Sequence, residues 1–288
     1  MIFYISILTL SDKILKLLDY LGFPKGTWQF RKIVLKYRKI IQKRIDILSL
    51  EVHYKNLILN SELVFDIGSN NGDYASVFLK YSSKVISIEP QKNLCKAQHD
   101  KFQNEIDSNR IFIENIAISS KRGRTKLYVN SKSELSSTSE KYQREVIPEE
   151  FSFTKNIDTV NVETRSLDDL IAKYGKPNYI KIDIEGNEKE AFLGLSHPIP
   201  LISFECTLPY FKKEMYDIIS ILKNLGDYQF TFLFLKNYEF KSKFMTFKEI
   251  EKLVDNGYLR NVFDLYCILP EHISNLSESY KRLLDKQF

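Results

Sequence analysis

Acidic residues follow two apolar runs on either side of the glycine-containing loop 68–72. Asp66 lies near the end of the run 63–67, ahead of the loop 68–72, and Glu89 ends the next apolar run. The distance between them is about the 20 residues at which a second-strand acid accepts hydrogen bonds from a ribose hydroxyl. The loop lacks the closely spaced glycines of a pyrophosphate cradle and the lysine of a P-loop. The pattern predicts an adenosine ligand without phosphates, commonly S-adenosylmethionine; an ordinary βαβ turn is the structural alternative.

A second acidic stretch lies at residues 179–186, where Lys181, Asp183 and Glu185 alternate with isoleucines. In a strand these three side chains share one face and the isoleucines share the other. Charged groups on a buried strand are costly unless they are paired or placed at a polar site. Gly186 then leads into a predicted helix, so we expect the acids at the strand's carboxyl end, where α/β sheets bind ligands. An ion pair of Lys181 with one acid is the structural alternative.

A further acid, Glu205, ends the apolar run 201–204. Carboxylates at a ligand edge can act as a base or hold a metal beside a substrate hydroxyl, which is a poor nucleophile at neutral pH. We take Asp183 as the first candidate for the base, and Glu185 and Glu205 as the alternatives. The same acids could hold a divalent cation, Mg²⁺ or Mn²⁺, through oxygen ligands.

The elements that must position these acids are predicted from periodicity. Apolar runs alternate with segments of helical spacing, five times in all, before two closing strands at 228–235 and 262–269. This order predicts a doubly wound α/β sheet. Residues 110–118 are expected to form its third strand. The serine-rich loop 130–140 and the irregular stretch to 158 could cover a ligand with Ser136, Ser137 and Thr138, or form a disordered insertion.

Composition and charge set further bounds. At 288 residues the chain fits one large domain, or one domain with an extension. The cysteines Cys95, Cys206 and Cys267 show no C-x-x-C spacing, which favours reduced thiols in a cytoplasm-like compartment and argues against zinc. The net charge of +5 is modest. Its placement near the N-terminus is more informative than its size.

The first sixty residues form a basic extension. The apolar start, 1–10, is too short to span a bilayer and lacks the features of a signal peptide. Helices are predicted at 11–21 and 28–50, and the second has no acid before Asp46. Its basic residues accompany an apolar stripe, a pattern also found on helices that contact an anionic membrane surface or an acidic acceptor. A solvated basic face on a helix docked to the core is the alternative, and no motif supports nucleic-acid binding.

Taken in order, the motifs resemble the FkbM-type S-adenosylmethionine-dependent methyltransferases. The likeness covers about residues 63–269, and its most specific part is K-I-D-I-E-G (181–186) with the preceding S-L-D-D-L (166–170). The other matching segments are 65–72, 88–90, 115–118 and 204–205. The resemblance implies a class I methyltransferase domain at 61–270, flanked by the helical extension 1–60 and the tail 271–288.

The resemblance also implies a Rossmann-like, seven-stranded sheet with an antiparallel last strand, and O-methylation of a hydroxyl, often on a sugar or polyketide. The acceptor is then a small molecule or glycan, and the protein is expected in the cytoplasm or peripheral to a membrane. The residues implied to bind the cofactor are Asp66, Gly68, Ser69, Asn70, Asn71, Gly72, Glu89, Pro90, Asn115, Ala117 and Asp183.

Two functions from other classes share parts of this pattern. A nicotinamide-dependent oxidoreductase would have the same sheet and Glu89, but a first loop richer in glycine. A non-catalytic carbohydrate-binding protein would keep the fold and lose the acids at the ligand edge, which this chain retains.

Overall fold

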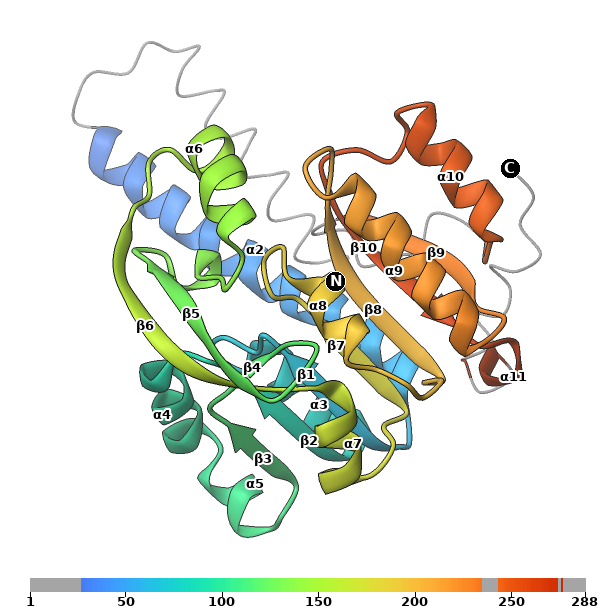
Figure 1. Ribbon diagram of the computed structural model, residues 1–288. Coiled ribbons are helices and arrows are strands. Elements are labelled where there is room, and N and C mark those ends of the chain that lie inside the picture. The colour runs from blue at the N-terminus through green and yellow to red at the C-terminus, as the bar shows by residue number, and fades with distance from the viewer. Residues whose placement is uncertain (1–26, 235–242, 274–275, 277–288) are drawn as a thin grey trace. The chain divides into compact units, whose positions relative to one another are not determined.

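The computed structural model describes residues 27–234, 243–273 and 276 (Figure 1). Contacts divide the described chain into two units, one ending at His53 and a larger one beginning at Tyr54. Helix α2 (Thr27–Ile58) runs through this boundary. It confirms the helix predicted at 28–50 and extends beyond it. The helix predicted at 11–21 and most of the tail 271–288 lie outside the described residues.

The larger unit is built on a seven-stranded sheet in the order β3-β2-β1-β7-β8-β10-β9. Its paired strands are parallel except for β10, which runs antiparallel to both β8 and β9. This is the predicted doubly wound sheet with an antiparallel last strand. The order reverses between β1 and β7, which is where open α/β sheets bind ligands. The strands are β1 (Ser61–Ile67), β2 (Ser82–Ile88), β3 (Ile111–Glu114), β7 (Tyr179–Ile182), β8 (Leu201–Thr207), β9 (Gln229–Phe234) and β10 (Val262–Ile268).

Helices cover both faces of this sheet. Phe65 and Ile67 of β1 face one apolar core, which α7, α8, α9 and α10 complete. On the other face, Phe78 of α3 packs edge-on against Tyr179 of β7, with 5.7 Å between the ring centroids. Asp66 and Lys181 share this second face because side chains alternate along a strand. The helices are α3 (Asp73–Tyr81), α4 (Lys92–Lys101), α5 (Gln103–Asp107), α7 (Leu167–Tyr174), α8 (Glu188–Leu193), α9 (Lys212–Leu225), α10 (Phe247–Asp255) and α11 (Pro270–Ile273).

A second, three-stranded sheet has the order β4-β6-β5. Its strands are β4 (Ala117–Ile118), β5 (Gly123–Asn130) and β6 (Asn156–Arg165). The single third strand predicted at 110–118 is therefore wrong. The chain leaves β3 after Glu114, and Asn115 donates hydrogen bonds to the carbonyls of Glu89 and Pro90. That turn carries the rest of the segment into the second sheet.

The stretch between β5 and β6, expected to be irregular, contains three short helices. They are η1 (Ser133–Leu135), the π-helical turn η2 (Tyr142–Val146) and α6 (Ile147–Glu150). Their apolar residues pack in a small separate cluster with Phe211. In the part of the chain that the structure describes, no helix is long and apolar enough to cross a membrane.

Candidate cofactor and acceptor site

The loop after β1 is held tightly against the start of the segment that leaves β7. Gly68 has φ +81° and donates its N–H to the carbonyl of Ile88 at 2.9 Å. A Cβ at this position would lie 1.8 Å from the carbonyl oxygen of Asp183. Only glycine combines this left-handed backbone with so close an approach. The loop and Asp183 thus meet at the carboxyl edge of the sheet.

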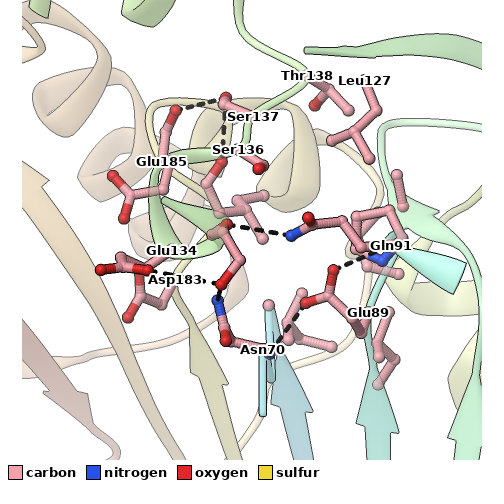
Figure 2. Close-up of a pocket in the computed structure, with 18 of the residues that line it drawn as sticks. Asn70, Glu89, Gln91, Leu127, Glu134, Ser136, Ser137, Thr138, Asp183 and Glu185 are labelled. Carbon is pink, nitrogen blue, oxygen red and sulfur yellow. Dashed lines mark hydrogen bonds between the residues drawn. The ribbon is translucent and has the colours of Figure 1, made fainter. Parts of the chain in front are cut away.

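Glu89 is a buried acid whose two oxygens are held by backbone amides. Its side chain is 3% exposed, and it accepts N–H groups from Asn70 at 2.9 Å and from Gln91 at 2.8 Å (Figure 2). Burial raises the pKa of Glu89, and these two hydrogen bonds act in the opposite direction. Carboxylate oxygens retain further lone pairs. Glu89 can therefore accept additional hydrogen bonds from ligand hydroxyls.

Glu89 lines a pocket at the ends of β1, β2 and β7 that holds about 490 Å³ of empty space, counted out to its mouth. The polar lining is Asn70, Glu89, Gln91, Ser133, Glu134, Ser136, Ser137, Thr138, Asp183 and Glu185. The rest of the wall is Gly68 and Pro90 with the apolar residues Ile67, Ile88, Ile116, Ala117, Ile118, Leu127 and Ile184. An acid beside an apolar wall suits a ribose joined to a flat base.

The segment between η1 and η2 forms one side of this pocket. The Gln91 amide donates to the carbonyl of Ser133 at 3.1 Å, and the Ser137 hydroxyl donates to the carbonyl of Glu185 at 2.7 Å. The Asn187 amide donates to the Thr138 hydroxyl at 2.8 Å. These bonds tie the segment to both β2 and the turn after β7. Ser136, Ser137 and Thr138 thus line the pocket, where the sequence led us to expect them.

The other residues expected to bind the cofactor do not line this pocket. They are Asp66, Ser69, Asn71, Gly72 and Asn115. The Gln98 amide donates to the Ser69 hydroxyl at 2.9 Å and to the Asn70 carbonyl at 2.7 Å. These two bonds hold the loop at Ser69 and Asn70. Sequence reasoning missed Gln91, Ser133 and Glu134, although Gln91 directly follows the strand-end motif.

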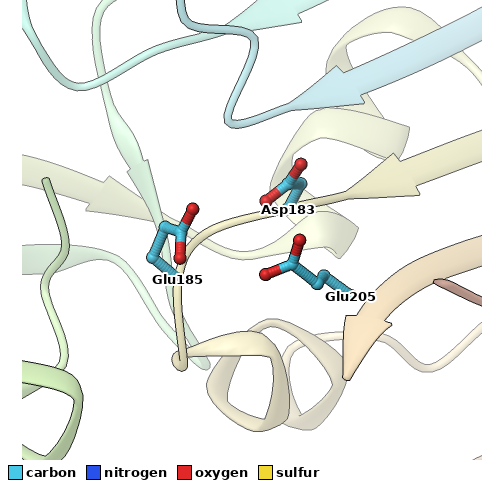
Figure 3. A group of neighbouring side chains, drawn as sticks. All are labelled: Asp183, Glu185 and Glu205. Carbon is cyan, nitrogen blue, oxygen red and sulfur yellow. The ribbon is translucent and has the colours of Figure 1, made fainter. Parts of the chain in front are cut away.

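Three carboxylates meet beside the pocket. Oxygens of Asp183, Glu185 and Glu205 all lie within 4.8 Å of one another (Figure 3). Burial and the nearby charge of Asp183 raise the pKa of Glu185 and of Glu205 well above the ordinary value. The expectation that the strand continues to Glu185, with its side chain on the same face as Asp183, is wrong. Strand β7 ends at Ile182, and Glu185 joins the cluster because it and the next residue, Gly186, have left-handed φ values of +57° and +90°.

Lys181 supplies a buried positive charge to this cluster. It is 3% exposed, its ammonium lies 2.7 Å from Oδ2 of Asp183, and it stands 4.2 Å from the ring centroid of Tyr74. The ion pair considered as a structural alternative is present. Asp183 also lines the pocket. The ion pair thus fixes the carboxylate at the pocket's edge rather than removing it from the site.

A second cavity adjoins the first and shares Glu185 with it. It holds about 670 Å³ of empty space out to its mouth. Burial and the neighbouring charge of Glu185 raise the pKa of Tyr142 on its wall. The lining is Leu135, Tyr142, Val146, Glu150, Phe151, Glu185, Glu205, Thr207, Leu208, Tyr210, Asn261 and Val262. The acidic cluster therefore stands where two cavities meet.

Asp66 leads to a prediction about stability. It is fully buried and neither carboxylate oxygen accepts a hydrogen bond. Burial raises its pKa from 3.8 to about 7, although Lys181 acts to lower it. The folded chain then binds the extra proton between these values, so the free energy of unfolding should fall by up to about 4 kcal/mol as pH rises through this range. Urea unfolding at several pH values measures this dependence. The free energy of unfolding of the Asp66→Asn variant should lack this fall between about pH 4 and pH 7. The same pH dependence in the variant and the unchanged protein would contradict the prediction.

The sheet order and its antiparallel strand are those of the class I methyltransferase fold, and the pocket lies at the carboxyl ends of β1, β2 and β7. A family model described as the methyltransferase FkbM domain matches residues 66–242. The chain therefore belongs to the FkbM methyltransferase family, which confirms the resemblance inferred from its motifs.

Several solved structures are similar to this chain. The methyltransferase FkbM from Methylobacillus flagellatus KT is 16% identical, with a TM-score of 0.45, over 72% of this chain and 43% of that one. An S-adenosylmethionine-dependent O-methyltransferase from Thermotoga maritima is 7% identical, with a TM-score of 0.37, over 77% of this chain and 64% of that one. An O-methyltransferase of tomaymycin synthesis from Streptomyces achromogenes was solved with S-adenosylmethionine. It is 6% identical, with a TM-score of 0.39, over 79% of this chain and 80% of that one. No curated protein matches the chain.

Proposed function

We propose that this protein is an S-adenosylmethionine-dependent O-methyltransferase acting on a hydroxyl of a sugar, glycan or related small molecule. The observation that carries the proposal is the meeting of two cavities at Asp183, Glu185 and Glu205. Methyl transfer needs a cofactor and an acceptor held in line, with a proton acceptor between them. The first cavity supplies the cofactor site and the second the acceptor site.

The first cavity fits S-adenosylmethionine in its chemistry. Glu89 would accept hydrogen bonds from the ribose hydroxyls, and Ile88, Ala117 and Leu127 would pack against the adenine. When bound, the cofactor supplies a methyl group already activated by its sulfonium centre. The protein therefore has mainly to align the acceptor and to take up its proton.

The second cavity fits a hydroxylated acceptor. Tyr142, Phe151 and Tyr210 offer flat apolar surfaces of the kind that can pack against a sugar ring. Glu185 and Glu205 offer carboxyl groups to its hydroxyls. This combination of rings and acids supports a sugar or glycan over a purely apolar acceptor.

Asp183 is the first candidate for the general base. The raised pKa of Glu185 and of Glu205 favours their protonated forms, whereas Asp183 is paired with the ammonium of Lys181. A protonated carboxyl donates a hydrogen bond and cannot take a proton from a hydroxyl. Protonation of Glu185 and Glu205 is one way to relieve the repulsion among the three carboxylates. A divalent cation, Mg²⁺ or Mn²⁺, bound among them is the other.

The proposal is tested with labelled S-adenosylmethionine and a panel of nucleotide sugars, free glycans, lipid-linked saccharides and small natural products. Mass spectrometry should detect a methyl group on a hydroxyl of one acceptor class. In parallel, ultraviolet titration with nicotinamide dinucleotides and with S-adenosylmethionine compares the two cofactors. Binding of the dinucleotide alone would favour the oxidoreductase alternative and overturn the proposal.

The Glu89→Ala variant should bind S-adenosylmethionine about 1–3 kcal/mol more weakly than the unchanged protein. The substitution removes the acceptor proposed for the ribose hydroxyls and leaves those donors unpaired in a buried site. Isothermal titration calorimetry with the cofactor measures the change without any acceptor. Glu62→Ala is the matched control, because Glu62 is an exposed acid on β1 near the opposite end of the strand. Equal affinities of the two variants would remove Glu89 from the cofactor site.

A further inference from the structure

Helix α2 exposes a row of large apolar side chains within the unit that ends at His53. Their spacing is i, i+4, i+7, i+14 and i+15, which places them on one side of an α-helix. Contiguous apolar patches on the surface of a protein often mark sites of interaction with a membrane or another protein. The stripe consists of Ile33, Tyr37, Ile40, Ile47 and Leu48, which are 52%, 62%, 47%, 41% and 37% exposed.

Exposed lysines flank one edge of this stripe. Lys32, Lys36 and Lys39 lie within about 100° of it around the helix axis. Beyond its other edge lie Val34 and Ile41, which are half-buried. The exposed stripe is therefore distinct from the apolar side of α2 that is partly covered. Its chemistry is that of an apolar strip bordered by positive charge and interrupted by one exposed basic residue, Arg44 at i+11.

We propose that α2 binds an anionic membrane surface, lying in the plane of the interface. The stripe from Ile33 to Leu48 would enter the boundary between headgroups and acyl chains, where apolar faces of interfacial helices sit. Lys36 and Lys39 would then face the anionic headgroups beside it. Each basic residue near such a surface tightens binding about fivefold. Charge complementarity thus selects an anionic lipid surface over a neutral one.

Co-sedimentation of the full chain with vesicles tests this directly. We expect binding to vesicles of phosphatidylcholine with about 30% phosphatidylglycerol at low salt, and at least about tenfold weaker binding to pure phosphatidylcholine. Binding to the anionic vesicles should weaken as salt screens the charges. Failure of the unchanged protein to sediment with anionic vesicles at low salt overturns the proposal.

A matched pair of substitutions tests the stripe itself. Ile40 lies on the stripe and is 47% exposed, whereas Leu35 lies on the opposite side of the helix and is 45% exposed. Ile40→Glu should weaken vesicle binding at least about tenfold, and Leu35→Glu should weaken it much less, although both add the same charge to the same helix. Equal losses from the two variants would show that overall charge, not the stripe, governs binding, and would overturn the proposal.

The double variant Lys36→Glu, Lys39→Glu should weaken binding to the anionic vesicles about 30-fold or more. Circular dichroism and the affinity for S-adenosylmethionine should stay unchanged in every variant, which excludes misfolding as the cause. The stripe could instead contact a second copy of the chain. Analytical ultracentrifugation without lipid tests whether the chain forms such a dimer. A dimer that Ile40→Glu dissociates, with vesicle binding unaffected, would overturn the membrane proposal.

Discussion

The Asp183→Asn variant is expected to transfer methyl groups about 10²–10⁴ times more slowly than the unchanged protein, the range for loss of a general base. The amide keeps the shape of the carboxylate but cannot take up the acceptor's proton. Cofactor affinity should stay close to that of the unchanged protein. Turnover is measured with saturating cofactor and with an acceptor identified in the panel. Near-normal turnover would make Asp183 structural and move the search for the base to Glu185 or Glu205.

Asp217→Asn is the matched control for this variant. Asp217 also pairs with a lysine, Lys189 at 2.8 Å, but the pair lies partly exposed at the surface. Its loss should leave turnover within about twofold, because exposed ion pairs contribute little. Chelator treatment of the unchanged protein separates the two routes. Activity that is lost with chelator and restored by Mg²⁺ or Mn²⁺ would mean that Asp183 serves a metal.

The Gly68→Ala variant should lose at least about 3 kcal/mol of unfolding free energy, or fail to fold. The added Cβ would lie 1.8 Å from the carbonyl oxygen of Asp183, so the loop or the β7 exit must move. Either movement disturbs the pocket that both segments line, which is the proposed cofactor site. Urea unfolding measures the stability, and calorimetry should show S-adenosylmethionine affinity reduced at least about tenfold in any folded fraction.

Gly257→Ala separates the steric clash from backbone strain. Gly257 has φ +75°, close to the +81° of Gly68, but no heavy atom lies within 4 Å of a Cβ built there. Its replacement should cost only the roughly 1–2 kcal/mol of a left-handed alanine. Equal destabilisation of the two variants would contradict the close approach of the loop to Asp183.

Local elements were predictable because their signals lie within a few neighbouring residues. The helix predicted at 28–50 lies within α2 (Thr27–Ile58), and the last strand, predicted at 262–269, matches β10 (Val262–Ile268). Ser166 opens the S-L-D-D-L segment and caps α7, where its side chain accepts the Asp169 N–H in a capping box. In these cases periodicity, or a polar side chain that satisfies a free amide, is enough to determine the element.

Strand pairing was less predictable because it depends on partners far away in the chain. Residues 110–118 look like one strand, yet β4 pairs with the distant β6, with Ala117 beside Thr164. The stretch after β5 shows no strong periodicity, and its short helices are held by contacts such as Tyr142 with Phe211. Long-range contacts of this kind leave little signal in the local sequence.

The sequence by itself determined that Glu89 and Asp183 stand just beyond strand ends, because acids after apolar runs must lie where the sheet meets solvent or ligand. Glu205 was expected to end its strand, but β8 continues to Thr207. The sequence also indicated the family, because its motifs occur in the order and at the spacing found in FkbM-type methyltransferases. Only the tertiary structure decided which acids meet. Glu185 reaches Asp183 and Glu205 through a left-handed turn, and Lys181 is buried against Asp183. Backbone turns and side-chain burial arise from packing across the sheet, so residue spacing along the chain does not encode them.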